Sequence, residues 1–137
     1  VDGFSMGGGG AMTLAMKRPD LFSSVVTYGG SFLKLPPDMM AKVQDPRRRE
    51  MMTQFAHWEY VPREAAAVRQ AGLRVRIICG DKDPAYQVNV AFKELLESLK
   101  IPVSWVTVEG LAHETTGLYN HAGVESFRFM QEGFKLP

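Results

Sequence analysis

The chain has 137 residues, 45% of them hydrophobic and 23% charged, and its formal net charge at pH 7 is +1. This composition is typical of one globular domain and argues against a disordered chain, which lacks this much apolar surface to bury. The near-zero charge argues against a nucleic-acid partner, and no apolar run approaches the roughly 20 residues that span a bilayer. The single cysteine, Cys79, rules out an internal disulfide and is expected in the core.

Apolar segments alternate with glycine and proline along the chain. Periodic apolar residues with caps or breakers predict helices, and β-branched or aromatic runs that end at glycine predict strands. In chain order we expect a helix over 11–17, a strand over 24–28 and helices over 46–55 and 63–71. A strand over 75–79, a helix over 86–100 and a strand over 103–108 follow. The last helix is expected to bury a stripe of apolar residues, Val124, Phe127, Met130 and Phe134.

Strands that alternate with helices are typical of a parallel sheet covered by helices, so the sequence predicts the α/β class. Residues 32–60 form an unusually long excursion between two of the strands, and such loops are often lids or binding loops. Trp58 and Tyr60 lie in it near several methionines. They either line a pocket for an acyl or aryl group or pack the excursion onto the sheet.

A serine flanked by glycines lies at the start of the chain. Residues 3–7 read Gly-Phe-Ser-Met-Gly and fit G-x-S-x-G, the nucleophile elbow in which a strand turns sharply into a helix. Glycine on both flanks is expected to remove side chains that would collide in this turn. The turn predicts Ser5 as a nucleophile and the N–H of Met6 as an oxyanion donor, because a helix N-terminus favours developing negative charge. The alternative is a glycine-rich turn with Ser5 as a helix N-cap.

Motifs for nucleotide binding and for metal binding do not fit the sequence. Counting G-x-G-x-x-G from Gly7 or Gly8 places Met12 or Thr13 at the third glycine, and no Gly-Lys-Ser/Thr follows for a phosphate loop. The sequence has no C-x-x-C and no H-E-x-x-H, so a metal site is not expected.

A serine needs a base to take its proton and an acid to orient that base. In the elbow fold the chain order is Ser, then Asp or Glu, then His. Asp81 and Asp83 both follow the strand predicted over 75–79. The carboxyl ends of parallel strands are where such sheets bind ligands, so either aspartate fits the acid. We favour Asp83, although Asp83 also fits a helix cap and Asp81 fits a residue of the turn.

Three histidines compete for the base. His113 directly follows the strand predicted over 103–108, whereas His57 lies in the long excursion and His121 in or near the last helix. His113 is therefore the predicted base.

The segment Gly-Phe-Ser-Met-Gly-Gly at 3–8, with Arg-Pro-Asp-Leu-Phe at 18–22, resembles the esterase D-like branch of the α/β-hydrolases. That branch includes S-formylglutathione hydrolases, feruloyl and acetylxylan esterases and mycolyltransferases. The spacings Gly80-x-x-Asp83 and Gly110-x-x-His113 match the acid and base positions of the superfamily.

The resemblance implies Ser5 as nucleophile, Asp83 as acid and His113 as base of a serine esterase. Such an enzyme forms an acyl-enzyme, acts on a small-molecule ester and uses no cofactor. A serine peptidase or acyltransferase of the same fold is the alternative within enzymes. A non-catalytic fragment or binding module that lacks a complete oxyanion hole is the alternative outside them.

The resemblance also implies that residues 1–137 are one partial domain, the C-terminal half of an α/β-hydrolase with the excursion at 32–60. A complete α/β-hydrolase has about eight strands, and the loop after the third supplies the second oxyanion N–H. That loop has no counterpart in the present sequence. The sequence leaves the compartment, the oligomeric state and the choice of ester undetermined.

Overall fold

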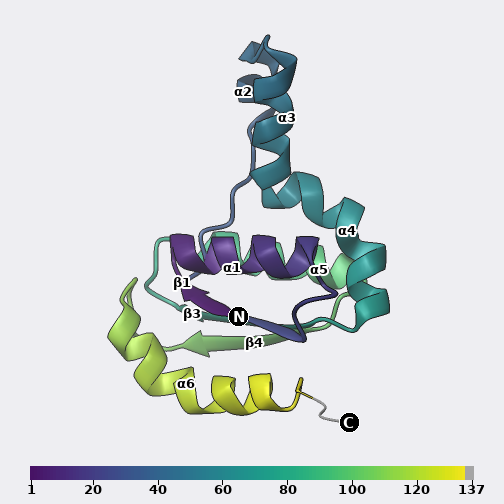
Figure 1. Cartoon of the computed structure of the whole chain (residues 1–137). Helices are drawn as coiled ribbons and strands as arrows, with labels where there is room; N and C mark the ends of the chain where they lie inside the picture. The colour runs from purple at the N-terminus through teal and green to yellow at the C-terminus, as the bar shows by residue number, and fades with distance from the viewer. Residues whose placement is uncertain (135–137) are drawn as a thin grey trace.

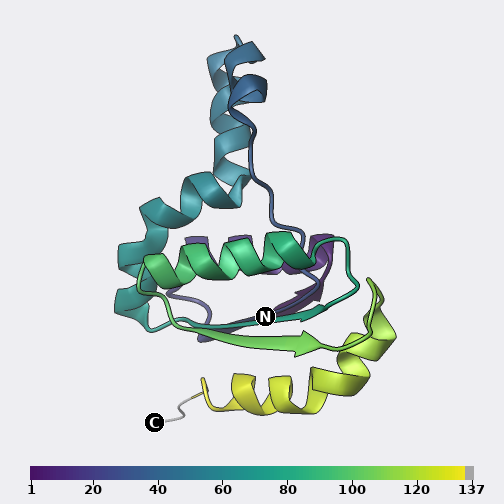
Figure 2. The same cartoon turned by 180° about the vertical axis from the view of Figure 1, so that it is seen from behind.

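The computed structural model describes residues 1–134 and shows a parallel sheet with helices on both faces (Figures 1 and 2). The strand order β1-β2-β3-β4 follows the chain, and each neighbouring pair is parallel. The strands are β1 (Asp2–Phe4), β2 (Ser24–Tyr28), β3 (Arg74–Gly80) and β4 (Val103–Val108). The predicted α/β class, a mainly parallel sheet flanked by helices, is confirmed.

Helices connect the strands and follow the last one. They are α1 (Met6–Lys17), α2 (Pro37–Lys42), α3 (Pro46–Phe55), α4 (His57–Ala71), α5 (Tyr86–Ser98) and α6 (Thr115–Gln131). In Figure 1 the sheet lies between α1 and α5 above and α6 below. Every residue of β2 is buried, as expected for a central strand of a parallel sheet covered on both faces. Across residues 1–134, no helix combines the length and hydropathy that a membrane span needs.

Two apolar clusters hold these layers together. The larger lies between the sheet and α1, α4 and α5, and includes Met12, Ile77 and Phe92. The smaller lies between the sheet and α6 and includes Ile78 and Leu118.

The burial of α6 differs from the prediction. Val124, Phe127 and Phe134 are 65%, 61% and 68% exposed, and only Met130 of the predicted stripe packs against the core. Leu118 and Ala122 are buried against the sheet instead. These residues recur every four positions on the opposite side of the helix, where the small side chain of Ala122 allows close approach. The prediction is wrong because the largest apolar side chains of α6 do not lie on its buried face.

Two helices begin earlier than predicted. Helix α1 starts at Met6 and includes the four glycines at 7–10, which carry no apolar periodicity. Helix α4 starts at His57 and contains Pro62, which was expected near a helix start. Pro62 has no backbone N–H, so α4 lacks one helical hydrogen bond there. Burial of Tyr60 and Val61 stabilises the first turns of the helix and offsets this loss.

The excursion at 32–60 is ordered and mostly helical. Helices α2 and α3 stand away from the sheet (Figures 1 and 2), and neither has a buried residue. The N-cap and proline predicted for α3 are present, since the carboxylate of Asp45 accepts a hydrogen bond from Arg47 N–H. Phe32 and Leu35 are buried in the body of the fold before these helices, and Ala56 and His57 are buried there after them.

Candidate active site

All four strands end at one edge of the sheet, toward which the arrows of β1 and β4 point in Figure 1. Ser5 follows β1, Asp83 lies just beyond β3 and His113 lies beyond β4. The structure therefore brings together three side chains separated by up to 108 positions in the sequence.

The backbone at Ser5 makes a sharp strand-to-helix turn. Ser5 has φ 53° and ψ −121°, a conformation that L residues rarely adopt, and its N–H donates to the carbonyl of Tyr28 at 2.9 Å. A Cβ at Gly3 would lie 2.4 Å from the backbone of Gly7, so glycine is required there, as predicted. The second expected collision was wrong: a Cβ at Gly7 would meet nothing within 4 Å.

The crowded glycine on the helical side is Gly8. A Cβ there would lie 2.9 Å from the carbonyl oxygen of Gly3 and 3.2 Å from Cα of Gly30. Helix α1 thus packs against the ends of β1 and β2 through Gly8, while Gly7 faces outward. This close packing holds Ser5 at the rim of the sheet, where its side chain remains partly exposed.

His113 lies between a hydroxyl and a carboxylate. Its Nε2 is 2.8 Å from Oγ of Ser5, and its Nδ1 is 2.6 Å from Oδ2 of Asp83. A carboxylate only accepts hydrogen bonds, so Nδ1 carries the proton and Nε2 accepts from the serine hydroxyl. The ring of Phe4 lies 4.6 Å from the imidazole, centroid to centroid, and supports its position.

The two candidate aspartates have different surroundings. The side chain of Asp83 is fully buried, and its second oxygen accepts from Ala85 N–H at 2.7 Å. Asp81 is partly exposed, accepts from Gly110 N–H at 2.7 Å and pairs with Lys82 at 3.6 Å. Asp81 thus ties the loop after β3 to the loop after β4, while Asp83 contacts the histidine.

The other two histidines lie away from Ser5. His57 is buried, its Nδ1 accepts from Leu33 N–H at 3.0 Å, and its Nε2 donates to the carbonyl of Gly9 at 3.1 Å. Burial lowers the pKa of His57, which favours a neutral ring that fastens the excursion to α1. His121 is exposed on α6.

The cysteine is in the core, as predicted. Cys79 is fully buried. Burial, followed by the nearby charge of Asp83, raises the pKa of the Cys79 thiol to about 12. A protonated, buried thiol is inert as a nucleophile at neutral pH.

The N–H of Met6 lies at the N-terminus of α1, directly after Ser5. Within residues 1–134 this N–H has no hydrogen-bond acceptor. The first N–H groups of a helix have no acceptor within the helix and favour negative charge.

Two residues of the site were not predicted. Gly29 ends β2 with φ +53°, and a Cβ there would lie 2.8 Å from Oδ2 of Asp83 and 3.2 Å from Nδ1 of His113. Asn89 of α5 is buried and donates to the carbonyls of Gly30 at 2.8 Å and Ala85 at 2.9 Å. Two features of the sequence could have indicated these residues. Gly29 is part of a double glycine after a strand, and Asn89 is a polar residue on the buried face of an amphipathic helix.

Replacing Gly29 with alanine is expected to lower, on the order of 100-fold, the kcat of any reaction that depends on the Asp83–His113 hydrogen bond. The added methyl group would displace the Asp83 carboxylate from His113, and a small misplacement of catalytic groups costs this much. Gly72→Ala is the matched control, because Gly72 also has a positive φ of +68° but has no atom within 4 Å of the added Cβ. Thermal unfolding of Gly72→Ala gives the stability cost of a side chain at positive φ alone, and Gly29→Ala should lose more because its methyl group also meets Asp83 and His113. Equal kcat values would contradict the role of Gly29.

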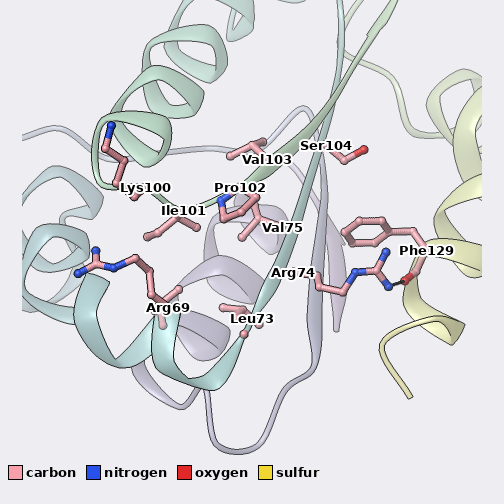
Figure 3. A pocket seen from close by; sticks show the side chains of 12 residues that line it. Arg69, Leu73, Arg74, Val75, Lys100, Ile101, Pro102, Val103, Ser104 and Phe129 are labelled. Atoms are coloured by element: carbon pink, nitrogen blue, oxygen red, sulfur yellow. Dashed lines mark hydrogen bonds between the residues drawn. The ribbon is translucent and has the colours of Figure 1, made fainter. Parts of the chain in front are cut away.

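Two cavities differ in their position relative to Ser5. One, of about 480 Å³, is lined by the start of the excursion, by Trp58 and by the first turns of α5, at the same edge of the sheet as Ser5, Asp83 and His113. The other, of about 540 Å³, lies at the opposite edge, where β3 and β4 begin (Figure 3). Arg74 lines the second cavity, and its guanidinium donates to the carbonyl of Phe129 at 2.7 Å.

A family model described as "Putative esterase" matches residues 1–126. Solved structures with a similar fold include a ferulic acid esterase, with a TM-score of 0.70 and 19% identity over 97% of this chain. A fluorophosphonate-binding serine hydrolase of Staphylococcus aureus has a TM-score of 0.71 and 21% identity over 94% of the chain. The S-formylglutathione hydrolase of Staphylococcus aureus has a TM-score of 0.64 and 20% identity over 96%.

The chain spans about half the length of these three structures, covering 51%, 52% and 49% of them. No curated protein matches the chain by sequence. The family match covers nearly the whole chain, and the structural matches agree with it in fold. This chain therefore belongs to the "Putative esterase" family and has the fold of the α/β-hydrolases.

Proposed function

We propose that this chain carries the catalytic triad of a carboxylic-ester hydrolase, with Ser5 as nucleophile, His113 as base and Asp83 as acid. The observation that carries the proposal is the continuous chain of hydrogen bonds from Oγ of Ser5 through His113 to the buried carboxylate of Asp83. Membership of an esterase family agrees with it.

In the proposed reaction Oγ of Ser5 attacks the ester carbonyl while Nε2 of His113 takes its proton. The C=O bond becomes a C–O⁻ single bond, and Met6 N–H donates to this oxyanion. The tetrahedral intermediate then expels the alcohol, which receives the proton from His113 and leaves an acyl-enzyme. Water attacks the acyl-enzyme by the same route and releases the carboxylic acid. Asp83 holds the imidazole in the required tautomer and stabilises its protonated form.

The whole chain is proposed to be one partial domain with an insertion at 32–60, and its oxyanion hole to be incomplete. The Met6 N–H is the one oxyanion donor proposed within this chain. In complete α/β-hydrolases the second donor comes from the loop after the third strand. Loss of one such donor typically lowers turnover by about 100- to 1000-fold.

Residues 1–137 expressed alone are therefore expected to hydrolyse p-nitrophenyl acetate at least about 100-fold more slowly than the protein at its natural length. Within the described residues β1 pairs only with β2, so its open edge should also drive dimerisation or aggregation. Size-exclusion chromatography and the ester assay measure both effects. A soluble monomer with full Ser5-dependent turnover would show that the second donor lies within this chain.

The function is tested by pre-steady-state hydrolysis of short p-nitrophenyl esters by the protein at its natural length. A serine esterase should release a burst of p-nitrophenol close to one equivalent of enzyme, followed by a slower steady rate. Ser5→Ala should remove both phases. Release that requires an added alcohol acceptor would favour an acyltransferase, and cleavage of peptide amides in preference to esters would favour a peptidase.

The two aromatic residues of the excursion have different environments. The hydroxyl of Tyr60 is buried 3.0 Å from Oγ1 of Thr13, so Tyr60 packs α4 onto α1. Trp58 lines the cavity at the catalytic edge and also packs against Phe92, with 5.3 Å between ring centroids. Trp58 therefore remains a candidate for contact with the substrate.

Trp58→Ala is expected to change the ratio of kcat/KM for aryl and alkyl esters on the order of tenfold, because it enlarges an apolar pocket. Phe55→Ala is the control, since Phe55 is an exposed aromatic residue that does not line this cavity. Equal losses for all esters, together with a lower Tm, would instead show that Trp58 only packs the excursion.

A further inference from the structure

We infer that the esterase selects substrates that carry a carboxylate, and that Lys34 binds this group in the cavity beside Ser5. The inference rests on the proposed function and names the substrate class of that site. It is argued from the position of the cavity, from its lining and from the charge of Lys34.

The wall of the cavity is joined to the backbone of the nucleophile through Ser31. Ser31 lines it, and the N–H of Ser31 donates to the carbonyl of Ser5 itself at 2.8 Å. On the other side it is lined by Gln87 and Val88, which follow Asp83 by four and five residues. These two links place the cavity beside both Ser5 and Asp83, and they favour it as the place for a group attached to an ester carbonyl at Ser5.

The size and lining of the cavity fit a small organic group. Its volume is about 480 Å³, within the range of about 300–1,000 Å³ for small-molecule sites. Phe32 is buried in its wall and stacks on Phe92 with 4.0 Å between centroids, and Trp58 packs against the same ring. This aromatic wall is rigid, so an apolar acyl chain or aryl ring would meet a preformed surface.

Lys34 is the charged residue of this lining. The other seven residues around the cavity are uncharged. The ammonium of Lys34 lies 5.7 Å from the centroid of the Trp58 ring. None of the ion pairs found among residues 1–134 involves Lys34.

A cation held over an aromatic face at the rim of an apolar cavity favours a ligand with an apolar body and an anionic end. The indole positions the ammonium without neutralising it, so a carboxylate of the substrate would be its first anionic partner. Gln87 and Ser31 can add neutral hydrogen bonds to the same group. A carboxylate on either the acyl or the alcohol part of the ester meets this requirement.

The test compares matched esters on the protein at its natural length. For the acyl part, the substrates are the 4-nitrophenyl monoester of adipic acid and its methyl-capped counterpart, which has no charge. For the alcohol part, they are 4-acetoxybenzoate and phenyl acetate. The measured quantity is the ratio of kcat/KM between the charged and the neutral ester of each pair.

Lys34→Gln is expected to lower this ratio about fivefold in one of the two pairs, and Lys34→Glu to lower it further, in keeping with a solvent-accessible ion pair. The ratio of the unmodified protein should also fall as ionic strength rises. The pair that responds identifies whether the acyl or the alcohol part occupies the cavity. Lys100→Gln and Lys100→Glu are the controls, because Lys100 lies at the opposite edge of the sheet and the charge change is the same (Figure 3).

Ratios that stay unchanged in both Lys34 variants, or that change equally in the Lys100 variants, would overturn the inference. Turnover of the neutral ester that depends on Ser5 would leave the proposed function intact in that case. Absence of Ser5-dependent turnover for every ester would instead contradict the proposed function.

Discussion

Replacing Ser5 with alanine is expected to lower kcat for p-nitrophenyl ester hydrolysis by about 10⁵- to 10⁶-fold, the loss found when the nucleophile of a serine triad is removed. The reason is that no other nucleophile lies within reach of His113: its Nε2 contacts only Oγ of Ser5 within residues 1–134. Circular dichroism and thermal unfolding should show an intact fold, because the hydroxyl of Ser5 has no further hydrogen-bond partner in that range.

Ser98→Ala is the matched control. Ser98 is exposed at the end of α5, and its hydroxyl only donates to the carbonyl of Leu95. Removal of this hydroxyl should leave kcat within about twofold of the value for the unmodified protein, because surface substitutions far from a site usually have small effects. A Ser5→Ala variant with turnover near that of Ser98→Ala would remove Ser5 from the mechanism.

Replacing Asp83 with asparagine is expected to lower kcat by about 10⁴-fold, the loss known for amidation of a triad acid. An amide N–H facing Nδ1 of His113 can donate a hydrogen bond to it, which favours the tautomer with the proton on Nε2, and that nitrogen then cannot accept from Ser5. Steady-state hydrolysis and thermal unfolding measure the change in activity and confirm that the variant is folded.

Asp81→Asn is the comparison that separates the two candidate acids. The asparagine side chain can still accept from Gly110 N–H, so we expect a loss of no more than about tenfold. A larger loss of turnover in Asp81→Asn, together with near-normal turnover in Asp83→Asn, would assign the acid role to Asp81.

Three of the four strands were predictable because they have a clear local signal, whereas β1 (Asp2–Phe4) is too short to show one. Residues 24–28 and 103–108 were expected as strands and form β2 and β4 with the same bounds. Both are short runs rich in β-branched and aromatic residues: 24–28 ends at Gly29, and 103–108 begins after Pro102 and is followed closely by Gly110. The register and the order of the strands came from the structure, since they depend on contacts between distant segments.

Helix faces were less predictable than helix positions. The apolar residues of α6 lie on two sides, and the side with the larger residues, Val124 and Phe127, is exposed. Which side packs depends on how closely the helix approaches the sheet, and small residues such as Ala122 decide that distance. The pattern of hydrophobic residues in the sequence does not indicate how closely α6 approaches the sheet.

The candidate triad was indicated by chain order and by position after strands, and the structure places Ser5, Asp83 and His113 in hydrogen-bond contact. Gly29 and Asn89 were not foreseen, because both act on loops that are distant in sequence. Gly29 leaves room for a carboxylate 54 positions later, and Asn89 fastens a carbonyl 59 positions earlier. Their roles depend on the folded arrangement of β2, β3 and α5.

The most direct measurement of the central claim is labelling of the protein at its natural length with a fluorophosphonate probe, followed by mass spectrometry of the labelled peptide. A fluorophosphonate reacts with a serine whose hydroxyl is activated by a neighbouring base, so it reports the Ser5–His113 contact directly. The account predicts one equivalent of label on Ser5, no label in Ser5→Ala and strongly slowed labelling in Asp83→Asn. Labelling at another residue, or labelling of Ser5→Ala at an unchanged rate, would contradict it.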